Sequence, residues 1–404
     1  MQYNGERYMS AQFALQWPGK VVFGVGQLAT IGEEAKRLGR RAFLVTNREL
    51  SNLGLAGRAQ FILESAGLQV LVFDDVQPDP TCVAVDAAAA LARSNRCDVV
   101  IALGGGSVID LAKGVTVAAT HEGPIWDYVT YTGANARPIT GTVLPLVAAP
   151  TTAGTGSEVT HGAVLDNPSL GMKAALLDAR LYARVALIDP ELTRTLPAGV
   201  TAMTGFDALT HGIESFLNVE RTNPGSELFA LEAIRRVAVY LPRVLADLQD
   251  HEARAELSWA ATCGGMCITL SNASVAHAMA LPLGARLGTP HGLALSRLQP
   301  VVLARTWKAQ PERCAQLAGA VGAAAAGMST EQKAEAFVNW IQSFVRQIGL
   351  TDLWTGPGPD NALCAQLTKD VFAYMGRPVR QYRPVFAPEE IQEMFAEALA
   401  SAGP

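Results

Sequence analysis

The sequence predicts a two-part fold, with an α/β domain over residues 1–197 and an all-α domain over residues 198–404. In the first part, short runs rich in Val, Ile and Leu alternate with segments of helical spacing, which is typical of βαβ units and a parallel sheet. In the second part strand-like runs nearly disappear, and apolar residues recur at helical spacing. Pro197 and Gly199 mark the predicted boundary.

The strand-like runs of the first part are nearly continuous in apolar residues, as expected for strands that are covered on both faces. The predicted strands lie within 19–24, 40–46, 69–76, 97–106, 143–152 and 184–192. The predicted helices between them cover 27–39, 83–95 and 107–120. Each helix joins two strands, so the connections are long enough for parallel pairing.

The second part contains several amphipathic segments. Helical spacing is found over 227–248, 253–265, 316–326 and 331–349. The alanine-rich stretch near residue 323 predicts a helix, a turn and a new helix that is capped by Ser329 or Thr330.

Composition and charge exclude several classes of protein. The chain has 404 residues, 49% hydrophobic and 17% charged, which suits a globular protein of about two domains. Its net charge of -5 and its lack of a basic patch argue against nucleic acid as a partner. The sequence has no apolar run long enough for a membrane span and no signal-peptide pattern, so we expect a cytoplasmic protein. The six cysteines show no CxxC pair and are interpreted as buried or reduced thiols.

A run of glycines joins a predicted strand to a predicted helix. Gly104, Gly105, Gly106 and Ser107 stand where a helix N-terminus offers free N–H donors. Glycines let a pyrophosphate approach the backbone, although a tight turn between strand and helix would have the same composition. The run lacks the spaced GxGxxG pattern, so it is a weak signal by itself.

A second loop rich in glycine and hydroxyl groups follows the strand at 143–152. Thr151, Thr152, Thr155 and Ser157 supply hydroxyls that could bind a phosphate, a ribose or an amide, or could only cap a helix. Two such loops at the carboxyl ends of parallel strands favour a nucleotide-binding crevice.

Four side chains of the second part form a candidate metal site. Asp207 and His211 are four residues apart, so they lie on one face of a helix. His277 lies in an apolar, helix-like run, and His291 lies at a chain turn between Pro290 and Gly292. One carboxylate and three imidazoles suit Fe(II) or Zn(II) better than Ca(II) or Mg(II). A surface Asp–His pair and a core histidine are the alternatives.

These motifs together carry a resemblance that spans nearly the whole chain. The chain resembles the iron-containing (group III) alcohol dehydrogenases, whose motifs are similar to five segments here, in the same order. They are 104–114, 150–160, 188–197, 206–215 and 276–292.

The resemblance implies a dehydroquinate synthase-like two-domain architecture, with a dinucleotide-binding domain before a helical, metal-binding domain. It implies that Asp207, His211, His277 and His291 bind Fe(II) or Zn(II) and form the catalytic centre. It implies NAD as cofactor, an alcohol or aldehyde as substrate, and a homodimer or higher homo-oligomer. The implied cofactor-binding residues are Asn47, Gly105, Gly106, Ser107, Thr151, Thr152, Thr155 and Lys173.

The chain departs from the family pattern at three places. Leu281 stands where the family often has a second His, which changes the expected proton route and substrate preference. Asn47 stands where an Asp often ends the second strand; an amide does not repel a 2′-phosphate, so NADP is less strongly excluded. The segment 267–277 is about two residues shorter than usual, which could reshape the pocket roof.

Other functions remain open from the sequence. A metal-independent reductase of the maleylacetate type is disfavoured because all four ligands are present. A synthase that uses NAD transiently is disfavoured because the ligand segments carry few cations besides Arg286 and Arg297. A glycerol-dehydrogenase-like polyol dehydrogenase and a non-enzymatic metal-binding protein are the further alternatives.

Overall fold

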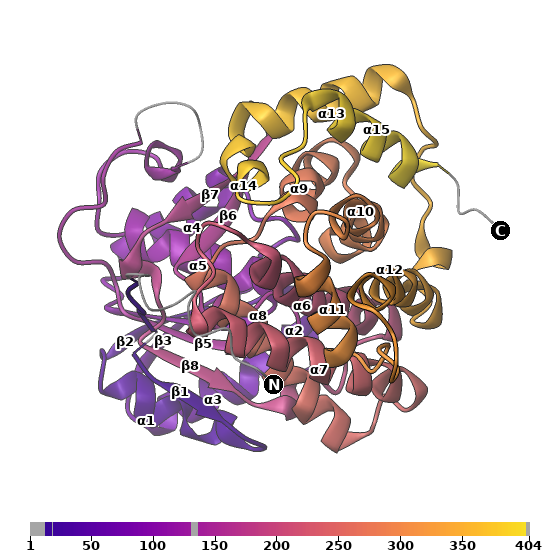
Figure 1. The fold of residues 1–404 in the computed structure, drawn as a ribbon. Coiled ribbons are helices and arrows are strands. Elements are labelled where there is room, and N and C mark those ends of the chain that lie inside the picture. Colours follow the sequence, from indigo (N-terminus) through magenta and orange to yellow (C-terminus); the bar gives the residue numbers. More distant parts are fainter. Residues whose placement is uncertain (1–12, 18, 131–135, 401–404) are drawn as a thin grey trace.

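The N-terminal part of the computed structural model is built on a six-stranded parallel sheet (Figure 1). The structure describes residues 13–17, 19–130 and 136–400. The strand order is β1-β8-β5-β4-β2-β3, and every pairing is parallel. The strands are β1 (Val21–Phe23), β2 (Arg41–Val45), β3 (Gln69–Phe73), β4 (Val99–Gly104), β5 (Leu146–Pro150) and β8 (Val185–Ile188). The predicted parallel sheet is confirmed.

Helices cover both faces of this sheet, which explains its continuous apolar strands. Alternate residues of β2 illustrate this, because Phe43 packs among residues of α4 and α5, whereas Leu44 packs among residues of α1 and α3. The covering helices are α1 (Ile31–Lys36), α3 (Leu55–Ser65), α4 (Cys82–Ser94) and α5 (Gly106–Ala118), with the short α2 (Arg48–Asn52) between β2 and α3. Short 3-10 helices are η2 (Gln27–Thr30), η3 (Ile125–Tyr128), η4 (Ser157–Val159), η5 (Ala179–Leu181) and η6 (Pro190–Thr193).

The chain changes direction across the sheet between β2 and β4. It runs from β2 to β3 on one side and then returns to add β4 and β5 on the other. The connections after β2 and β4 therefore leave on opposite faces and open a crevice at the carboxyl ends of these strands. Ligands of open α/β sheets bind at such a switch point.

An antiparallel hairpin outside the sheet was not predicted from the sequence. It joins β6 (Gly162–Asn167) to β7 (Met172–Leu177). Its turn, 168–171, begins with Pro and ends with Gly171 at a positive φ of 57°, which is ordinary turn chemistry. Asp110 of α5 accepts a hydrogen bond from the backbone N–H of Val164 at 2.8 Å, so the hairpin is anchored to α5.

All regular elements after Pro197 in the described chain are helical, as expected. The helices are α6 (Ala198–Leu217), α7 (Pro224–Ala246), α8 (His251–Leu270), α9 (Val275–Leu287), α10 (His291–Thr306), α11 (Pro311–Ala320), α12 (Thr330–Gln347), η7 (Thr351–Leu353), α13 (Asn361–Tyr374), α14 (Gly376–Arg380) and α15 (Pro388–Leu399). The predicted start of α12 is confirmed, because Ser329 forms a capping box with Gln332. One large apolar core joins these helices.

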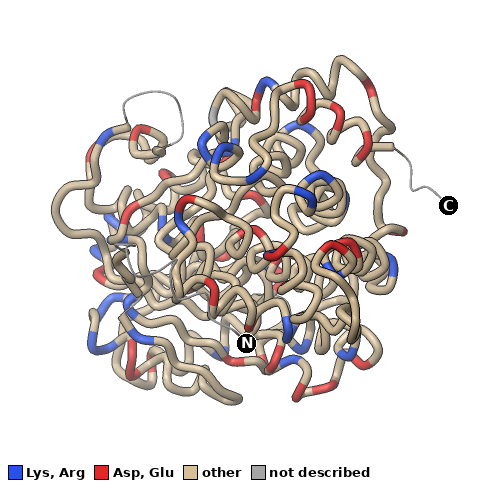
Figure 2. The backbone as a smooth tube through the Cα atoms, in the orientation of Figure 1, with Lys and Arg blue, Asp and Glu red and all other residues tan. Residues whose placement is uncertain are grey.

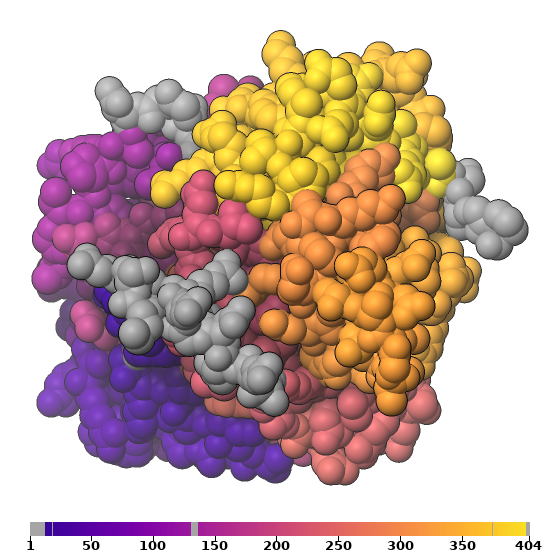
Figure 3. Space-filling view, viewed as in Figure 1, coloured from indigo at the N-terminus to yellow at the C-terminus, as the bar shows by residue number. Residues whose placement is uncertain are grey.

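Glycines let the two parts approach closely. A Cβ on Gly156, in the loop after β5, would lie 2.4 Å from Cα of Gly265 in α8. A Cβ on Gly154 would lie 2.6 Å from Cβ of Thr204 in α6. The loop after β5 is therefore clamped against the first helices of the second part. In the space-filling view the C-terminal helices, in yellow, meet the magenta segment of the α/β part near the top (Figure 3).

Charged residues of both signs are interspersed along the described chain (Figure 2). All six cysteines are free thiols. Five of them are buried, and Cys97 is half-buried. By length and composition, no single helix in the described chain could cross a membrane; α8 and α9 pass that test only as a pair that bends by 104° at its break.

Candidate active site

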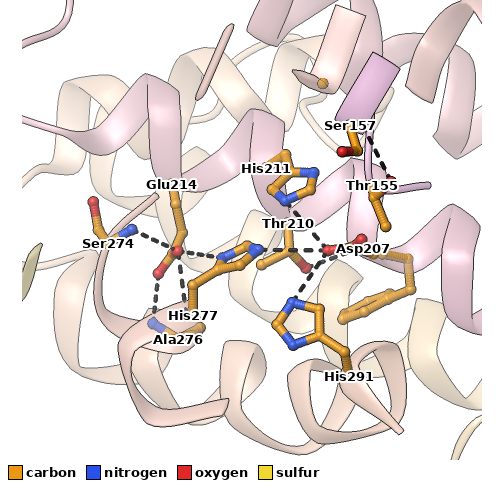
Figure 4. Close-up of polar contacts among 12 residues, drawn as sticks. Thr155, Ser157, Asp207, Thr210, His211, Glu214, Ser274, Ala276, His277 and His291 are labelled. Atoms are coloured by element: carbon orange, nitrogen blue, oxygen red, sulfur yellow. Dashed lines mark hydrogen bonds and ion pairs between the residues drawn. The ribbon is translucent and has the colours of Figure 1, made fainter. Parts of the chain in front are cut away.

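The ligand atoms of Asp207, His211 and His277 lie within 4.8 Å of one another, and His291 lies beside Asp207 (Figure 4). Oδ1 of Asp207 lies 3.4 Å from Nε2 of His211 and 3.4 Å from Nε2 of His277. Nε2 of His291 lies 3.7 Å from the same oxygen. Asp207, His211 and His277 are buried, whereas the side chain of His291 is 36% exposed. The cluster therefore has a closed side and one more open side.

Helix geometry and one glycine bring these side chains together. Asp207 and His211 lie four residues apart on α6, as predicted, and His277 lies in the first turn of α9. The sequence predicted a chain turn at His291. In the structure this turn is the start of α10, and His291 is its first residue. A Cβ on Gly292 would lie only 2.2 Å from the carbonyl oxygen of Met203. Glycine at this position is thus what lets the start of α10 approach α6.

A buried carboxylate behind the cluster holds His277 in place. Oε2 of Glu214 is 2.6 Å from Nδ1 of His277, and it also accepts the backbone N–H of Ser274 at 2.8 Å. Oε1 accepts the backbone N–H of Ala276 at 2.5 Å. Glu214 has no exposed surface. A carboxylate on Nδ1 fixes the ring so that Nε2 points into the cluster, as in many metal sites.

The cluster has polar atoms that the protein does not satisfy. Oδ1 of Asp207 and Nε2 of His277 are buried and have no hydrogen-bond partner among the described residues. Unsatisfied buried polar atoms are costly, and here they face one another. A cation bound at this point would satisfy both at once. The residues present therefore fit a borderline divalent metal with one carboxylate and three imidazole ligands.

The electrostatics of the cluster differ among its members. Burial lowers the pKa of His211 and of His291 to about 4, so both rings are neutral near pH 7. Burial also acts to lower the pKa of His277, but the carboxylates of Asp207 and Glu214 outweigh it and raise this pKa to about 9. Burial alone would raise the pKa of Asp207, yet the three imidazoles hold it well below its ordinary value. Without a metal, one proton therefore resides on His277 at neutral pH.

The cluster opens into a cavity of about 630 Å³ that continues to the switch point of the sheet. All the predicted cofactor-binding residues line this same cavity. They are Asn47, Gly105, Gly106, Ser107, Thr151, Thr152, Thr155 and Lys173.

The two predicted loops form the sheet side of this cavity. A Cβ on Gly106 would lie 2.7 Å from Cγ2 of Thr155, and one on Gly105 would lie 3.1 Å from Cγ2 of Thr152. The two loops are therefore packed against each other at the N-terminus of α5. No side chain caps that helix N-terminus, and Gly105, Gly106 and Ser107 line the cavity, so the N-terminus of α5 borders it.

Asn47 and Lys173 occupy more constrained positions than the sequence indicated. Oδ1 of Asn47 accepts the N–H of Leu50 at 2.9 Å and so caps α2. Lys173 of β7 is buried rather than on the surface, and its Nζ pairs with Oδ2 of Asp79 at 2.7 Å. Both remain on the cavity wall, but each has a structural partner.

Leu281 lines the cavity beside His277 and is half-buried. It lies one helical turn beyond His277 on α9 and faces the cavity rather than the helical core. The wall at this point is apolar.

Sequence reasoning missed several residues that complete the site. Glu214 lies three residues after His211 on the same helix face, which was the available signal. His161, Arg221 and Thr269 also line the cavity without belonging to any motif. Their positions depend on how the loop after β5 and the ends of α6 and α8 pack, so their spacing in the sequence carried no information.

Comparison with known proteins agrees with this architecture. Residues 18–190 match the model of the iron-containing alcohol dehydrogenases, and residues 201–396 match that of the C-terminal part of the same family. The chain is 36% identical over 345 residues to a choline dehydrogenase of Bacillus subtilis, covering 85% of each chain. It is 41% identical over 286 residues to a 4-hydroxybutyrate dehydrogenase of Cupriavidus necator, covering 69% of this chain and 73% of that one.

A solved structure of similar fold contains the expected type of cofactor. The sulfoacetaldehyde reductase of Bifidobacterium kashiwanohense in complex with NAD+ has a TM-score of 0.84 and is 28% identical, covering 98% of this chain and all of that chain. The α/β part, the helical part and the carboxylate–histidine cluster between them define a metal-dependent oxidoreductase that transfers a hydride between a nicotinamide cofactor and an alcohol or aldehyde. Within that class, the chain belongs to the iron-containing alcohol dehydrogenase family.

Proposed function

We propose that the protein oxidises a small alcohol to the aldehyde, and catalyses the reverse reduction, with Asp207, His211, His277 and His291 holding Fe(II) or Zn(II). The observation that carries this proposal is the cluster of buried, mutually facing and unsatisfied ligand atoms at the wall of a cavity that also contains the nucleotide loops. A metal held there would act as a Lewis acid that stabilises the alkoxide form of the alcohol.

The protein's own contribution is to hold and orient. Glu214 fixes the ring of His277, and the closed side formed by α6 and α9 excludes water from the ligand atoms. The half-exposed side of His291 leaves room for a substrate oxygen. Leu281 cannot relay a proton, so the proton of the alcohol leaves through water or a cofactor hydroxyl.

We place NAD along the crevice from Asn47 to the threonine loop. Gly105, Gly106 and Ser107 at the N-terminus of α5 suit the pyrophosphate. Thr151, Thr152 and Thr155 suit the ribose and amide groups nearer the metal cluster, because their loop is clamped on α6 at Gly154. NAD+ would accept the hydride at its nicotinamide ring, and NADH would supply it in the reverse reaction. Asn47 provides no fixed charge against a 2′-phosphate, so the proposed preference for NAD over NADP is modest.

Two alternative activities are less well supported by the site. A maleylacetate-type reductase would not need the ligand set, and all four ligands are in place. A synthase that binds a phosphorylated sugar acid needs several cations near the metal, whereas Arg286 pairs with Asp370 and does not line the cavity. A polyol dehydrogenase of the glycerol type differs from the proposal in substrate alone.

The proposal is tested by following absorbance of the reduced cofactor. The purified enzyme, with its metal content measured, is supplied with NAD or NADP and a panel of alcohols, diols and polyols. We expect metal-dependent reduction of NAD that a chelator abolishes and added Fe(II) or Zn(II) restores. A metal-loaded enzyme that reduces neither cofactor with any panel member would contradict the proposal.

A further inference from the structure

One cation on the cavity wall has no role in the site described above. Among the described residues, two basic residues line the cavity. They are Lys173 and Arg221. Lys173 is paired with Asp79 at 2.7 Å, on the nucleotide side. No carboxylate of the described chain lies within ion-pair distance of the Arg221 guanidinium, and its side chain makes no hydrogen bond there.

Arg221, an exposed residue, lines the same cavity as the metal cluster. It follows α6, the helix that carries Asp207 and His211, four residues after the last residue of that helix, Leu217. His211 and Leu217 are separated by about 9 Å of helix rise. Arg221 and the metal cluster therefore border the same cavity, and α6 and the segment that follows it carry Arg221, Asp207 and His211.

The wall around Arg221 carries neutral polar groups. His161 and Thr269 line the same end of the cavity, and Nδ1 of His161 lies 3.5 Å from Oγ1 of Thr269. Burial, followed by the charges of Lys113 and Arg221, lowers the pKa of His161 to about 4, which agrees with a neutral ring in the field of the guanidinium. These groups could hydrogen-bond a ligand without adding negative charge.

The carboxylates of the cavity are all elsewhere. Glu49, Asp79, Asp110 and Asp166 belong to the nucleotide side, and Asp207 belongs to the metal cluster. The remaining lining of this end comes from the break between α8 and α9 and from α14. It consists of Ile268, Asn272, Ala273, Met375 and Pro378. The cavity-lining residues around Arg221 thus carry no carboxylate; Asp178, whose charge also acts on His161, does not line the cavity.

This break between α8 and α9 has an unusual backbone. Asn272 adopts a φ of 122°, which a residue other than glycine rarely adopts, and its side-chain amide donates to Oε1 of Gln381 at 3.1 Å. The segment is the one that the sequence suggested would reshape the pocket roof. A backbone held in this way by its surroundings is frequent at ligand-binding sites.

We infer that Arg221 is a specificity-determining residue that binds a terminal anionic group of the substrate, so that the preferred substrates are short ω-hydroxy acids and the matching aldehyde acids. The inference rests on the proposed function, because it places the reacting hydroxyl at the metal cluster and the anionic end at Arg221. A guanidinium binds a carboxylate or a sulfonate through two parallel N–H···O bonds, which fixes orientation as well as charge.

The test compares substrates that differ in the charge at one end. Initial rates with NAD are measured for 4-hydroxybutanoate against 1,4-butanediol, and for 2-hydroxyethanesulfonate against choline, a pair of opposite charge. For the native enzyme we expect kcat/KM to be higher for 4-hydroxybutanoate than for the diol, and higher for the sulfonate than for choline. The relative rates of the carboxylate and the sulfonate show which anion the subsite prefers.

The variant Arg221→Gln isolates the proposed contact. We expect the ratio of kcat/KM between 4-hydroxybutanoate and 1,4-butanediol to fall about ten- to a hundredfold, mainly through KM, and Arg221→Lys to recover part of it. Arg58→Gln is the matched control, because Arg58 is exposed on α3 and does not line the cavity; it should leave the ratio unchanged.

The outcomes separate the two proposals. A native enzyme that turns over the diol but prefers it to the acid overturns the inference and leaves the proposed function standing. An equal loss for acid and diol in Arg221→Gln does the same, because it indicates a structural effect. Failure of the metal-loaded native enzyme on every substrate overturns the proposed function itself.

Discussion

The two walls of the cavity are built in different ways. The nucleotide wall consists mainly of loops and a helix N-terminus, where glycines bring backbone N–H groups to the surface. The metal wall consists of side chains on α6, α9 and α10, with Glu214 as a second layer behind His277. One wall relies on backbone placement and the other on buried side chains, so substitutions should affect the two walls separately.

The largest effect is expected from a variant that changes the metal wall and leaves the nucleotide wall intact. His277→Ala removes a proposed imidazole ligand. We expect the native protein to hold about one metal ion per chain and the variant to lose most of it. Its NAD affinity should change little, because the nucleotide loops lie on other elements. Elemental analysis and NAD titration of the same preparation measure both quantities.

Gly106→Ala changes the nucleotide wall and leaves the metal wall intact. Its Cβ would lie 2.7 Å from Cγ2 of Thr155, so the two nucleotide loops must shift. It should retain the metal and bind NAD more weakly. Full metal occupancy in His277→Ala would show that the cluster is not the metal site, and loss of both properties in each variant would show that the walls are not independent.

Substitution of Glu214, which lies behind His277, should weaken metal binding less than substitution of the ligand His277 itself. In Glu214→Gln the amide cannot accept two backbone N–H groups and orient His277 as the carboxylate does. We expect metal affinity to fall about ten- to a hundredfold. Competition with a chelator of known affinity gives the change, and Glu335→Gln, an exposed glutamate on α12, serves as the control. Unchanged affinity would reduce Glu214 to a purely structural role.

Metal affinity should also depend on pH, because the metal competes with one proton on His277. In the absence of metal, the carboxylates of Asp207 and Glu214 overcome the effect of burial and raise the pKa of His277 to about 9, whereas burial lowers the pKa of His211 and His291 to about 4. Metal binding must therefore displace the proton of His277 below pH 9. Affinity should rise about tenfold per pH unit from pH 6 to 8 and level off above pH 9.

The same titration predicts the stability of the metal-free protein. The pKa of His277 is raised on folding, so its contribution to stability is present below its unfolded pKa of about 6.5 and is lost as pH rises through about 9. Chelator competition at several pH values and thermal melts of the metal-free protein measure the two effects. A flat affinity profile between pH 6 and 8 would show that His277 is already neutral in the metal-free site.

The two walls also differ in how far the sequence alone predicted them. The glycine and threonine loops are local, so their position between strand and helix could be read from residue type. Asp207 and His211 could likewise be paired by helical spacing. For Glu214 the only signal was its helical spacing from His211, and Gly292 had none, because their functions depend on α9 and α10 packing against α6. The hairpin that carries Lys173 was missed because its strands stand outside the βαβ pattern.

Asn47, which we propose to contact the cofactor, also has a structural function. The sequence placed it after the second strand as a contact to the ribose, and it does line the cavity there. The structure adds that its Oδ1 caps α2 through the N–H of Leu50 at 2.9 Å. The side chain therefore serves the helix and the crevice at once, and a substitution must preserve the cap before it can report on the cofactor.

Substitution of Asn47 is expected to have the smallest effect on activity, because a charge at this half-exposed position is screened by solvent. In Asn47→Asp one carboxylate oxygen can keep the cap while the other supplies a fixed charge against a 2′-phosphate. We expect the NAD/NADP ratio of kcat/KM to rise about fivefold, which corresponds to ~1 kcal/mol. Asn47→Ser is the control, because serine also caps helices but carries no charge, and its ratio should stay near the native one. If the ratio in Asn47→Asp equals that of the native protein while both variants melt normally, the ribose does not lie at Asn47, and the cofactor must enter the crevice along another path.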